Sequence, residues 1–471
     1  MNDASKTSRW PRQIKYIIGN EACERFSYYG MRSILAGYIT GAVLKGGLGQ
    51  DADTSTEIIH LFVFANYFMP LLGAWLSDKL IGRYHTILWV SLFYCAGHGV
   101  LACSDFAGDV HGKMLCLGTG LALIAFGSGG IKPCVSAFMG DQFKPEQSHL
   151  LQKAYGAFYW AINFGSFFSF LVIPWIKNHH GYSLAFLVPG ILMAIATFIF
   201  WLGTKHYVRV PPSRETKSAG FFKVFFAALT GQHAAGQAFW DGARSRFSAQ
   251  EIDAAKSVLP ILMVFALIPI FFSLFDQTNS TWVLQGEKMA PANVLGLKIG
   301  AEEMQSMNAL IVMILVPLFT LGIYPRIGRF ASPLKRMAYG MFLAAGSYLV
   351  VAALQKQIEA GAQLSVLWQT LPYVILTAAE VLVSTTGLEF AFREAAPEMK
   401  SIVMSFWLLT IAFGDLFVAV LTKILSNGAG NASVSTGRFM QYAGLTFVVA
   451  ILFSLVATFY QYRDAAAARG K

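Results

Sequence analysis

The sequence predicts an all-α membrane protein of about twelve transmembrane helices arranged in two six-helix bundles. Three observations lead to this prediction. Of the 471 residues, 55% are hydrophobic and only 13% are charged, whereas a soluble protein carries about 25% charged residues. Apolar stretches that are long enough to cross a bilayer recur along the whole chain. One long polar segment divides these stretches into two equal sets.

The apolar stretches have the length of about 20 residues that a helix needs to cross about 30 Å of hydrocarbon. Two segments near the start, 14–43 and 57–80, cross only if their polar residues find partners. The clearly apolar stretches are 86–103, 114–135, 154–176, 183–203, 258–282, 306–324, 336–354, 366–390, 401–425 and 440–460.

The charges outside the spans predict how the chain is oriented. The basic residues before the first span are not followed by a short apolar core and a cleavage site, so we expect no removed signal peptide. Lys and Arg are concentrated in alternate loops, which places both chain ends in the cytoplasm. This sidedness explains the net charge of +10, so we expect no nucleic-acid binding. The five cysteines show no metal-ligand spacing, so we expect neither a disulfide framework nor a zinc site.

The long polar segment predicts three parts of the chain. Residues 1–204 form an N-terminal bundle, 205–256 a cytoplasmic linker and 257–471 a C-terminal bundle. The apolar run 221–229 within the linker is too short to cross and is suited to a helix lying at the membrane interface. Two bundles with a site between them near the midplane are typical of one large class of transporters.

The first span carries four ionisable residues along one side. At about 100° per residue they share one arc of the helix with two tyrosines, and the opposite side is apolar. The residues on this arc are Glu21, Glu24, Arg25, Tyr28, Tyr29 and Arg32. Each ionised residue costs about 2.5–3.5 kcal/mol near a helix centre, so they must face a cavity or each other. The alternative is that they only hold helices together.

Two later spans also hold residues that titrate or carry charge. His60 shares a helix face with Tyr67, and its ordinary pKa of about 6.5 suits proton transfer near neutral pH; a purely structural histidine is the alternative. Lys132 follows Gly127, Gly129 and Gly130, which permit a bend or only close helix packing.

The cations and carboxylates within the spans lie in opposite halves of the chain. Arg25, Arg32 and Lys132 belong to the first half, and Asp276 and Glu380 to the second. A ligand between the halves would meet both signs of charge, which suits a zwitterion such as an amino acid or a peptide. The neutral polar residues of the spans favour a peptide, and Trp407 either walls the pocket or packs in the core. These neutral residues include Tyr159, Asn163, Ser280, Asn308 and Ser384.

Several motifs resemble a known family. Glu21-x-x-Glu24-Arg25 is similar to the ExxER motif of the proton-coupled oligopeptide transporter family, within the major facilitator superfamily. Segments 73–87 and 155–167 resemble that family's two signatures, and Phe275-Asp276-Gln277 and 380–390 also match it. The interval between Asp78 and Gly82 is one residue longer than the commonest form of the superfamily loop motif.

The resemblance implies the major facilitator fold and proton-coupled symport of di- and tripeptides by alternating access. It implies that Arg25 and Lys132 bind the peptide carboxylate and Glu380 the amino terminus. It further implies that Asn163 and Asn308 bind backbone amides, and that Tyr28, Tyr29, Tyr67, Tyr159, Trp282, Ser384 and Trp407 line the pocket. Glu21, Glu24 and His60 would couple the proton. Arg32–Asp276 and Lys132–Glu380 would be the gating salt bridges.

The same resemblance sets expectations for partners and location. We expect no cofactor, because a proton gradient drives transport, and a chain that works as a monomer in the bilayer. The short segment 355–365, where animal members carry a large external domain, predicts a bacterial cytoplasmic membrane. A carrier of the same fold for nitrate, an amino acid or a peptide-like drug is the nearer alternative. An intramembrane enzyme is the farther one, and no nucleophile motif supports it.

Overall fold

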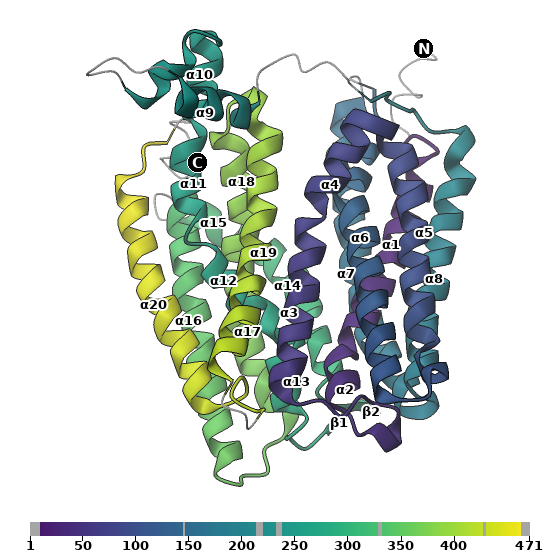
Figure 1. The fold of residues 1–471 in the computed structure, drawn as a ribbon. Coiled ribbons are helices and arrows are strands. Elements are labelled where there is room, and N and C mark those ends of the chain that lie inside the picture. Colours follow the sequence, from purple (N-terminus) through teal and green to yellow (C-terminus); the bar gives the residue numbers. More distant parts are fainter. Residues whose placement is uncertain are drawn as a thin grey trace.

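The computed structural model describes residues 10–144, 147–212, 220–231, 238–327, 332–426 and 430–462. In this part of the chain almost every element is a helix, and the two strands β1 (Ala292–Val294) and β2 (Leu297–Ile299) pair as one short antiparallel hairpin. Figure 1 shows two groups of helices side by side, the first half of the chain in purple and blue and the second in green and yellow.

Each bundle holds the helices of one half of the chain. In the first bundle α1 packs on α7 and α8, and α5 on α6; in the second, α16 packs on α17 and α20. The first bundle consists of α1 (Ile14–Ser33), α2 (Leu35–Thr40), α3 (Ala52–Phe68), α4 (Pro70–Trp75), α5 (Gly82–Ala102), α6 (Val110–Gly140), α7 (Ser148–His180) and α8 (Tyr182–Leu202). The second consists of α11 (Val258–Phe265), α12 (Pro269–Phe275), α13 (Thr281–Gly286), α14 (Ser306–Pro317), α15 (Tyr324–Ile327), α16 (Pro333–Glu359), α17 (Thr370–Glu380), α18 (Thr386–Glu394), α19 (Lys400–Leu425) and α20 (Thr436–Phe459).

The lengths of these helices agree with about twelve crossings. Nine of the described helices are long and apolar enough to cross a membrane, or ten if Ala249–Phe265 and Pro269–Asn279, bent by 43°, form one span. The helical run Ala52–Ala102 counts once, but its 51 residues are far too long for a single crossing at about 1.5 Å per residue. It turns at Gly82, where φ is +78°. Helix α1 adds a further crossing, and its charges explain why hydropathy alone misses it.

The glycines of α6 serve close helix packing. A Cβ atom on Gly129 would lie 2.6 Å from the Cβ of Met69, and one on Gly127 would lie 2.5 Å from the Cβ of Tyr94. Helix α6 continues through Pro133 without a break. Of the two roles predicted for these glycines, the structure therefore supports close packing of α6 against its neighbours.

The two ends of the molecule differ. One end, which we call the linker end, carries α9 (Phe221–Thr230) and α10 (Ala249–Lys256), and the N- and C-terminal parts of the chain lie on the same side (Figure 1). On α9, Phe222 and Phe226 are exposed while Phe221 and Val224 are buried, as expected of a helix at a membrane interface. The opposite end, the hairpin end, carries β1 and β2.

The ion pairs that join the bundles in the described part of the chain lie between the middle of the molecule and the hairpin end. They are Arg32–Asp276, His60–Asp415, Lys177–Glu302 and Glu57–Lys423. The structure therefore has a closed hairpin end.

Candidate functional site

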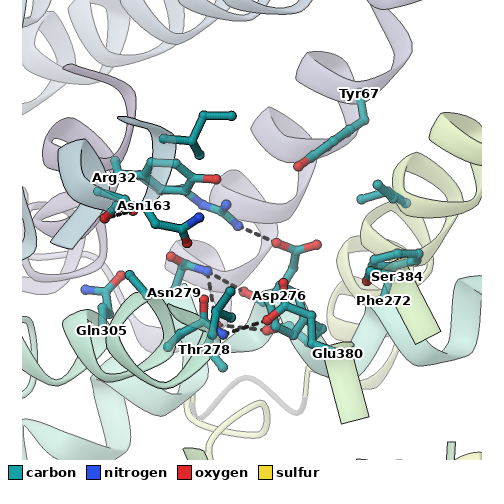
Figure 2. Close-up of a pocket in the computed structure, with 18 of the residues that line it drawn as sticks. Arg32, Tyr67, Asn163, Phe272, Asp276, Thr278, Asn279, Gln305, Glu380 and Ser384 are labelled. Carbon is teal, nitrogen blue, oxygen red and sulfur yellow. Dashed lines mark hydrogen bonds and ion pairs between the residues drawn. The ribbon is translucent and has the colours of Figure 1, made fainter. Parts of the chain in front are cut away.

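A cavity of about 310 Å³ lies between the two bundles and is lined by both. This volume falls at the lower end of the range of small-molecule sites, about 300–1,000 Å³. Its polar lining, part of which is drawn in Figure 2, comprises Tyr29, Arg32, Tyr67, Tyr159, Asn163 and Ser166 from the first half, and Asp276, Thr278, Asn279, Gln305, Asn308, Tyr373, Glu380 and Ser384 from the second.

The pair Arg32–Asp276 crosses this cavity. Arg32 lies near the end of α1, and Asp276 begins the 3₁₀ turn Asp276–Asn279 that interrupts the helix after α12. The distance from Arg32 Nη2 to Asp276 Oδ1 is 2.7 Å, and both side chains are buried (Figure 2). A buried charge is stable only when it is paired. This ion pair therefore ties the two bundles together at the cavity.

The remaining charges of α1 pair with one another. Arg25 Nε lies 3.2 Å from Glu21 Oε1 and also contacts Glu24. None of the three lines the cavity. Oε1 of Glu24 is buried without a hydrogen-bond partner in the described part of the chain. In this conformation Arg25 is thus occupied by two carboxylates of its own helix.

Lys132 lies directly behind the cavity wall. Its ammonium sits over the rings of Tyr28 and Tyr67, at 4.7 Å and 4.3 Å from their centroids, which are favourable cation–π distances. Tyr67 lines the cavity. Among the described contacts Lys132 has no ion pair, and the predicted pair with Glu380 is not formed here.

Glu380 is the carboxylate of the cavity that carries no ion pair within the described residues. It ends α17, and its Oε2 accepts a hydrogen bond of 2.7 Å from Nδ2 of Asn308. Asn308 also donates to Thr377 at 3.2 Å. One oxygen of Glu380 is therefore positioned by an amide, and no positive side chain of the described residues pairs with this carboxylate.

His60 joins three elements in a buried cluster. Its Nδ1 lies 2.6 Å from Oδ1 of Asp415 on α19, and its Nε2 lies 2.9 Å from the hydroxyl of Ser280. All three side chains are fully buried. Asp415 is not among the residues predicted for the site. The sequence nevertheless contains a feature that points to it: Asp415 is the single carboxylate in the apolar stretch 401–425. An ionisable residue inside a span is by default a candidate for a functional role.

The other predicted residues fall into two groups. Tyr29, Tyr67, Tyr159, Asn163, Asn308, Ser384 and Trp407 line the cavity. Trp407 also packs against Phe265 and Phe272. Tyr28 is buried behind the wall and accepts a hydrogen bond from Asn66. Trp282 does not line the cavity: it is fully buried between Tyr348 and Tyr373, and Tyr373 forms part of the cavity wall.

The site offers no catalytic centre in its described part. Ser280, His60 and Asp415 have the order of a nucleophile, base and acid, but none of them lines the cavity and all are fully buried. A substrate in the cavity therefore does not reach the serine. Among the described residues no group of three or more His, Cys, Asp or Glu side chains could hold a metal ion.

Comparison with known proteins gives consistent matches. The model of the POT family (PTR2) matches residues 84–437. The chain is 36% identical over 365 residues to solute carrier family 15 member 2 of Danio rerio, covering 74% of this chain and 50% of that protein. It is 37% identical over 368 residues to peptide transporter family 1 of Drosophila melanogaster, covering 75% and 49%. The chain thus spans about half the length of the curated relatives it matches.

Solved structures match over nearly the whole chain. An auto-inhibited POT family peptide transporter superposes with a TM-score of 0.87 at 38% identity, covering 97% of this chain and 98% of that one. The POT family transporter PepTSo gives the same TM-score and identity, with 97% and 99% covered. These matches confirm the predicted fold class.

Proposed function

This chain belongs to the POT family and is an integral membrane protein, and on that premise we propose that it is a proton-coupled symporter of di- and tripeptides that works by alternating access. The observation that carries the proposal is the cavity between the bundles. Among the described residues, the carboxylate of Glu380 in one wall has no ion pair, and neither has the ammonium of Lys132 behind the opposite wall. Two unpaired charges of opposite sign suit a ligand that carries both.

In this proposal the peptide is held at both ends. Glu380 binds its ammonium group, and Lys132 and Arg25 bind its carboxylate. Asn163 and Asn308, which line the cavity, bind the amide groups between the ends. Because Arg25 is occupied by Glu21 and Glu24 in this structure, it becomes free for the substrate only when one of those carboxyls takes up a proton.

That exchange couples the proton to the peptide. Protonation of Glu21 or Glu24 weakens its hold on Arg25, and the peptide carboxylate replaces it. One proton that crosses about 100 mV releases about 2.3 kcal/mol, and one pH unit adds about 1.36 kcal/mol. Together they support an accumulation of several hundred-fold. The chain therefore needs no cofactor as a source of energy.

The conformational cycle follows from where the bundles are joined. We assign the linker end to the cytoplasm, because Lys and Arg are concentrated there, and the hairpin end to the outside. The closed hairpin end then makes this the inward-facing arrangement. To open outward, the bundles must release Arg32–Asp276 and His60–Asp415 and close the opposite end, where Lys132–Glu380 is the proposed bridge.

The location and assembly state are also part of the proposal. The connection between α16 and α17 is short, with only residues 360–369 between the two helices. This favours a bacterial cytoplasmic membrane, with both ends of the chain inside. Each chain contains a complete cavity, so a monomer suffices.

Counterflow in proteoliposomes tests the substrate assignment. Vesicles that contain unlabelled dialanine inside should take up labelled dialanine from outside, and mass spectrometry should recover the dipeptide intact. Vesicles loaded with alanine or nitrate serve as controls and should give no exchange. Exchange of alanine or nitrate in place of dialanine would support the nearer alternative, and hydrolysed product would support an enzyme.

A further inference from the structure

A second charged cluster lies at the hairpin end, away from the cavity. Lys177 near the end of α7 reaches across the bundle interface to Glu302, which precedes the 3₁₀ turn η8 (Glu303–Gln305). The distance from Nζ to Oε2 is 2.6 Å, with the side chains 17% and 6% exposed. This ion pair must break whenever the hairpin end opens.

The other oxygen of Glu302 has no such partner. Oε1 is buried and forms no hydrogen bond within the described part of the chain. It lies beside Gly37, where a Cβ atom would be 2.6 Å from Oε1 of Glu302 and 3.2 Å from Oε1 of Glu287. One oxygen of each carboxylate therefore lies against Gly37, and a side chain at residue 37 would press on both.

The electrostatic balance of the cluster is unfavourable when both carboxyls are ionised. Lys177, which is half-buried, faces both carboxyls, and Lys288 also faces the exposed Glu287. Glu303 adds a third negative charge beside Glu302. The titratable and charged groups that face Glu302 are Lys177 of α7, Tyr182 of α8, Glu287 after α13 and Glu303 of η8. Nearby like charges and burial both favour the neutral form of a carboxyl.

We propose that Glu302, together with Glu287, is a proton-binding site of the outer face, and that the bound proton holds this end of the molecule closed. The proton would sit on Oε1 of Glu302 and be donated in a hydrogen bond to Oε1 of Glu287, which supplies the missing partner. Lys177 would keep its contact with Oε2. The inference rests on the proposed function, because it assumes that the hairpin end faces outward and opens during the cycle.

The direction of the pH dependence follows from linkage. Burial, opposed by Lys177, raises the pKa of Glu302 from an ordinary 4.5 to about 7. Glu302 precedes the span that begins at Glu303, so opening exposes it to water, and its pKa should then return toward the ordinary value. The state with the higher pKa is favoured by acid. A fall in outer pH from above 7 to about 4.5 therefore stabilises the closed state, and opening releases the proton.

Another carboxylate at the same end, that of Asp53, differs from Glu302 because both of its oxygens have hydrogen-bond donors. Asp53 of α3 accepts hydrogen bonds from the backbone N–H groups of Ser433 and Ala432, at 2.7 Å and 3.2 Å, and from the hydroxyl of Ser426 at 3.1 Å. It also joins the two bundles, but both of its oxygens are satisfied as acceptors.

Distance measurements between spin labels test the inference in the full chain. Leu44 and Leu295 are fully exposed on opposite bundles at the hairpin end, and the five native cysteines, all free, are replaced before labelling. Between pH 8 and 5 the ratio of closed to open molecules should rise by more than about tenfold. The variant Glu302→Gln, which mimics the protonated carboxyl, should stay closed and change less than about twofold.

The matched control is Glu303→Gln. Glu303 is the next residue and is also buried, but its carboxylate accepts a hydrogen bond from the backbone N–H of Gly300. It should keep the acid response of the parent. A Glu302→Gln variant that titrates like the parent, or a parent that opens on acidification, overturns the inference. Acid-driven dialanine uptake by the parent is measured in parallel. If it is absent, the proposed function fails; if it is present while Glu302→Gln titrates normally, only this inference fails.

Discussion

The hairpin end and the central cavity use buried charge in opposite ways. At the hairpin end, charges of one bundle find their partners on the other: Lys177 meets Glu302, and three donors surround Asp53. At the cavity, Glu380 and Lys132 each lack an ion pair within the described residues. A satisfied charge stabilises one arrangement of the bundles, whereas an unsatisfied one remains available to a ligand of opposite charge.

The pair Arg32–Asp276 stands between these two cases. It lines the cavity, yet it is already satisfied across the bundle interface at 2.7 Å. We therefore place it with the contacts that close the hairpin end rather than with the proposed peptide-binding groups. Substitutions at the hairpin end should therefore change the ratio of molecules with this end closed to molecules with it open. Substitutions at the unpaired charges should instead change peptide affinity.

The largest expected effect is the loss of the unpaired carboxylate. In Glu380→Gln the amide keeps the contact with Asn308 but no longer attracts an ammonium group. Dialanine affinity measured by calorimetry should fall by about 100-fold, or about 2.7 kcal/mol, as expected for the loss of one partner of a desolvated charge pair. Ser384→Ala, a neutral change in the same wall, should cost much less. Unchanged binding by Glu380→Gln would remove this residue from the peptide site.

Lys132→Gln should have a comparable but smaller effect, because Arg25 provides a second cation for the peptide carboxylate. We expect dialanine affinity to fall by about tenfold, or about 1.4 kcal/mol. Lys423→Gln is the control, since Lys423 is exposed and pairs with Glu57 at the hairpin end. If Lys423→Gln weakens dialanine affinity as much as Lys132→Gln does, Lys132 has no specific role in binding the peptide.

Asp53→Asn tests the satisfied side of the comparison. The amide loses the charge-assisted character of three hydrogen bonds, so the closed state should lose about 1.4 kcal/mol, a tenfold change in the closed-to-open ratio measured with the spin labels. Dialanine affinity of the closed state should stay unchanged. Asp51→Asn, whose carboxylate instead caps α3 by accepting from Thr54 N–H, should leave that ratio nearly unaltered.

The smallest effect is expected from Gly37→Ala. The added methyl group would press on the Oε1 atoms of Glu302 and Glu287 and move them apart. This separation lowers the pKa of Glu302, so the midpoint of the acid response should shift downward by less than about one pH unit. Gly99→Ala is the control, because no atom lies within 4 Å of a Cβ there. An upward shift would contradict the proposed crowding.

The sequence predicts polar and charged residues well where they lie together on one helix. It predicts them less well where the fold brings them together from different helices. The polar arc of α1 and the partition of charge between the halves could be predicted, since both depend on helical periodicity and on the cost of charge in lipid. The position of Trp282 could not. The 3₁₀ turn Asp276–Asn279 and the unusual backbone of Ser280 (φ −129°, ψ −91°) interrupt the helix, so the residues after it no longer follow its face.

The ion-pair partners of isolated charged residues could not be predicted from the sequence either. Asp415 is 355 positions from His60, and Glu302 is 125 from Lys177. Asp415 stands out as a carboxylate inside an apolar stretch, but nothing local identifies its partner, and nothing local distinguishes Glu302 from a charge at the end of a loop. Their burial and pairing depend on how the two bundles meet, which periodicity within one helix does not report.

Concentrative uptake tests the central claim most directly. Proteoliposomes with an inside-negative potential of about 100 mV and an outside that is one pH unit more acidic provide about 3.7 kcal/mol per proton. Labelled dialanine should accumulate more than about 100-fold inside, and a protonophore should abolish the gradient. Equilibration to equal concentrations, with no response to the protonophore, would contradict proton-coupled transport by this chain.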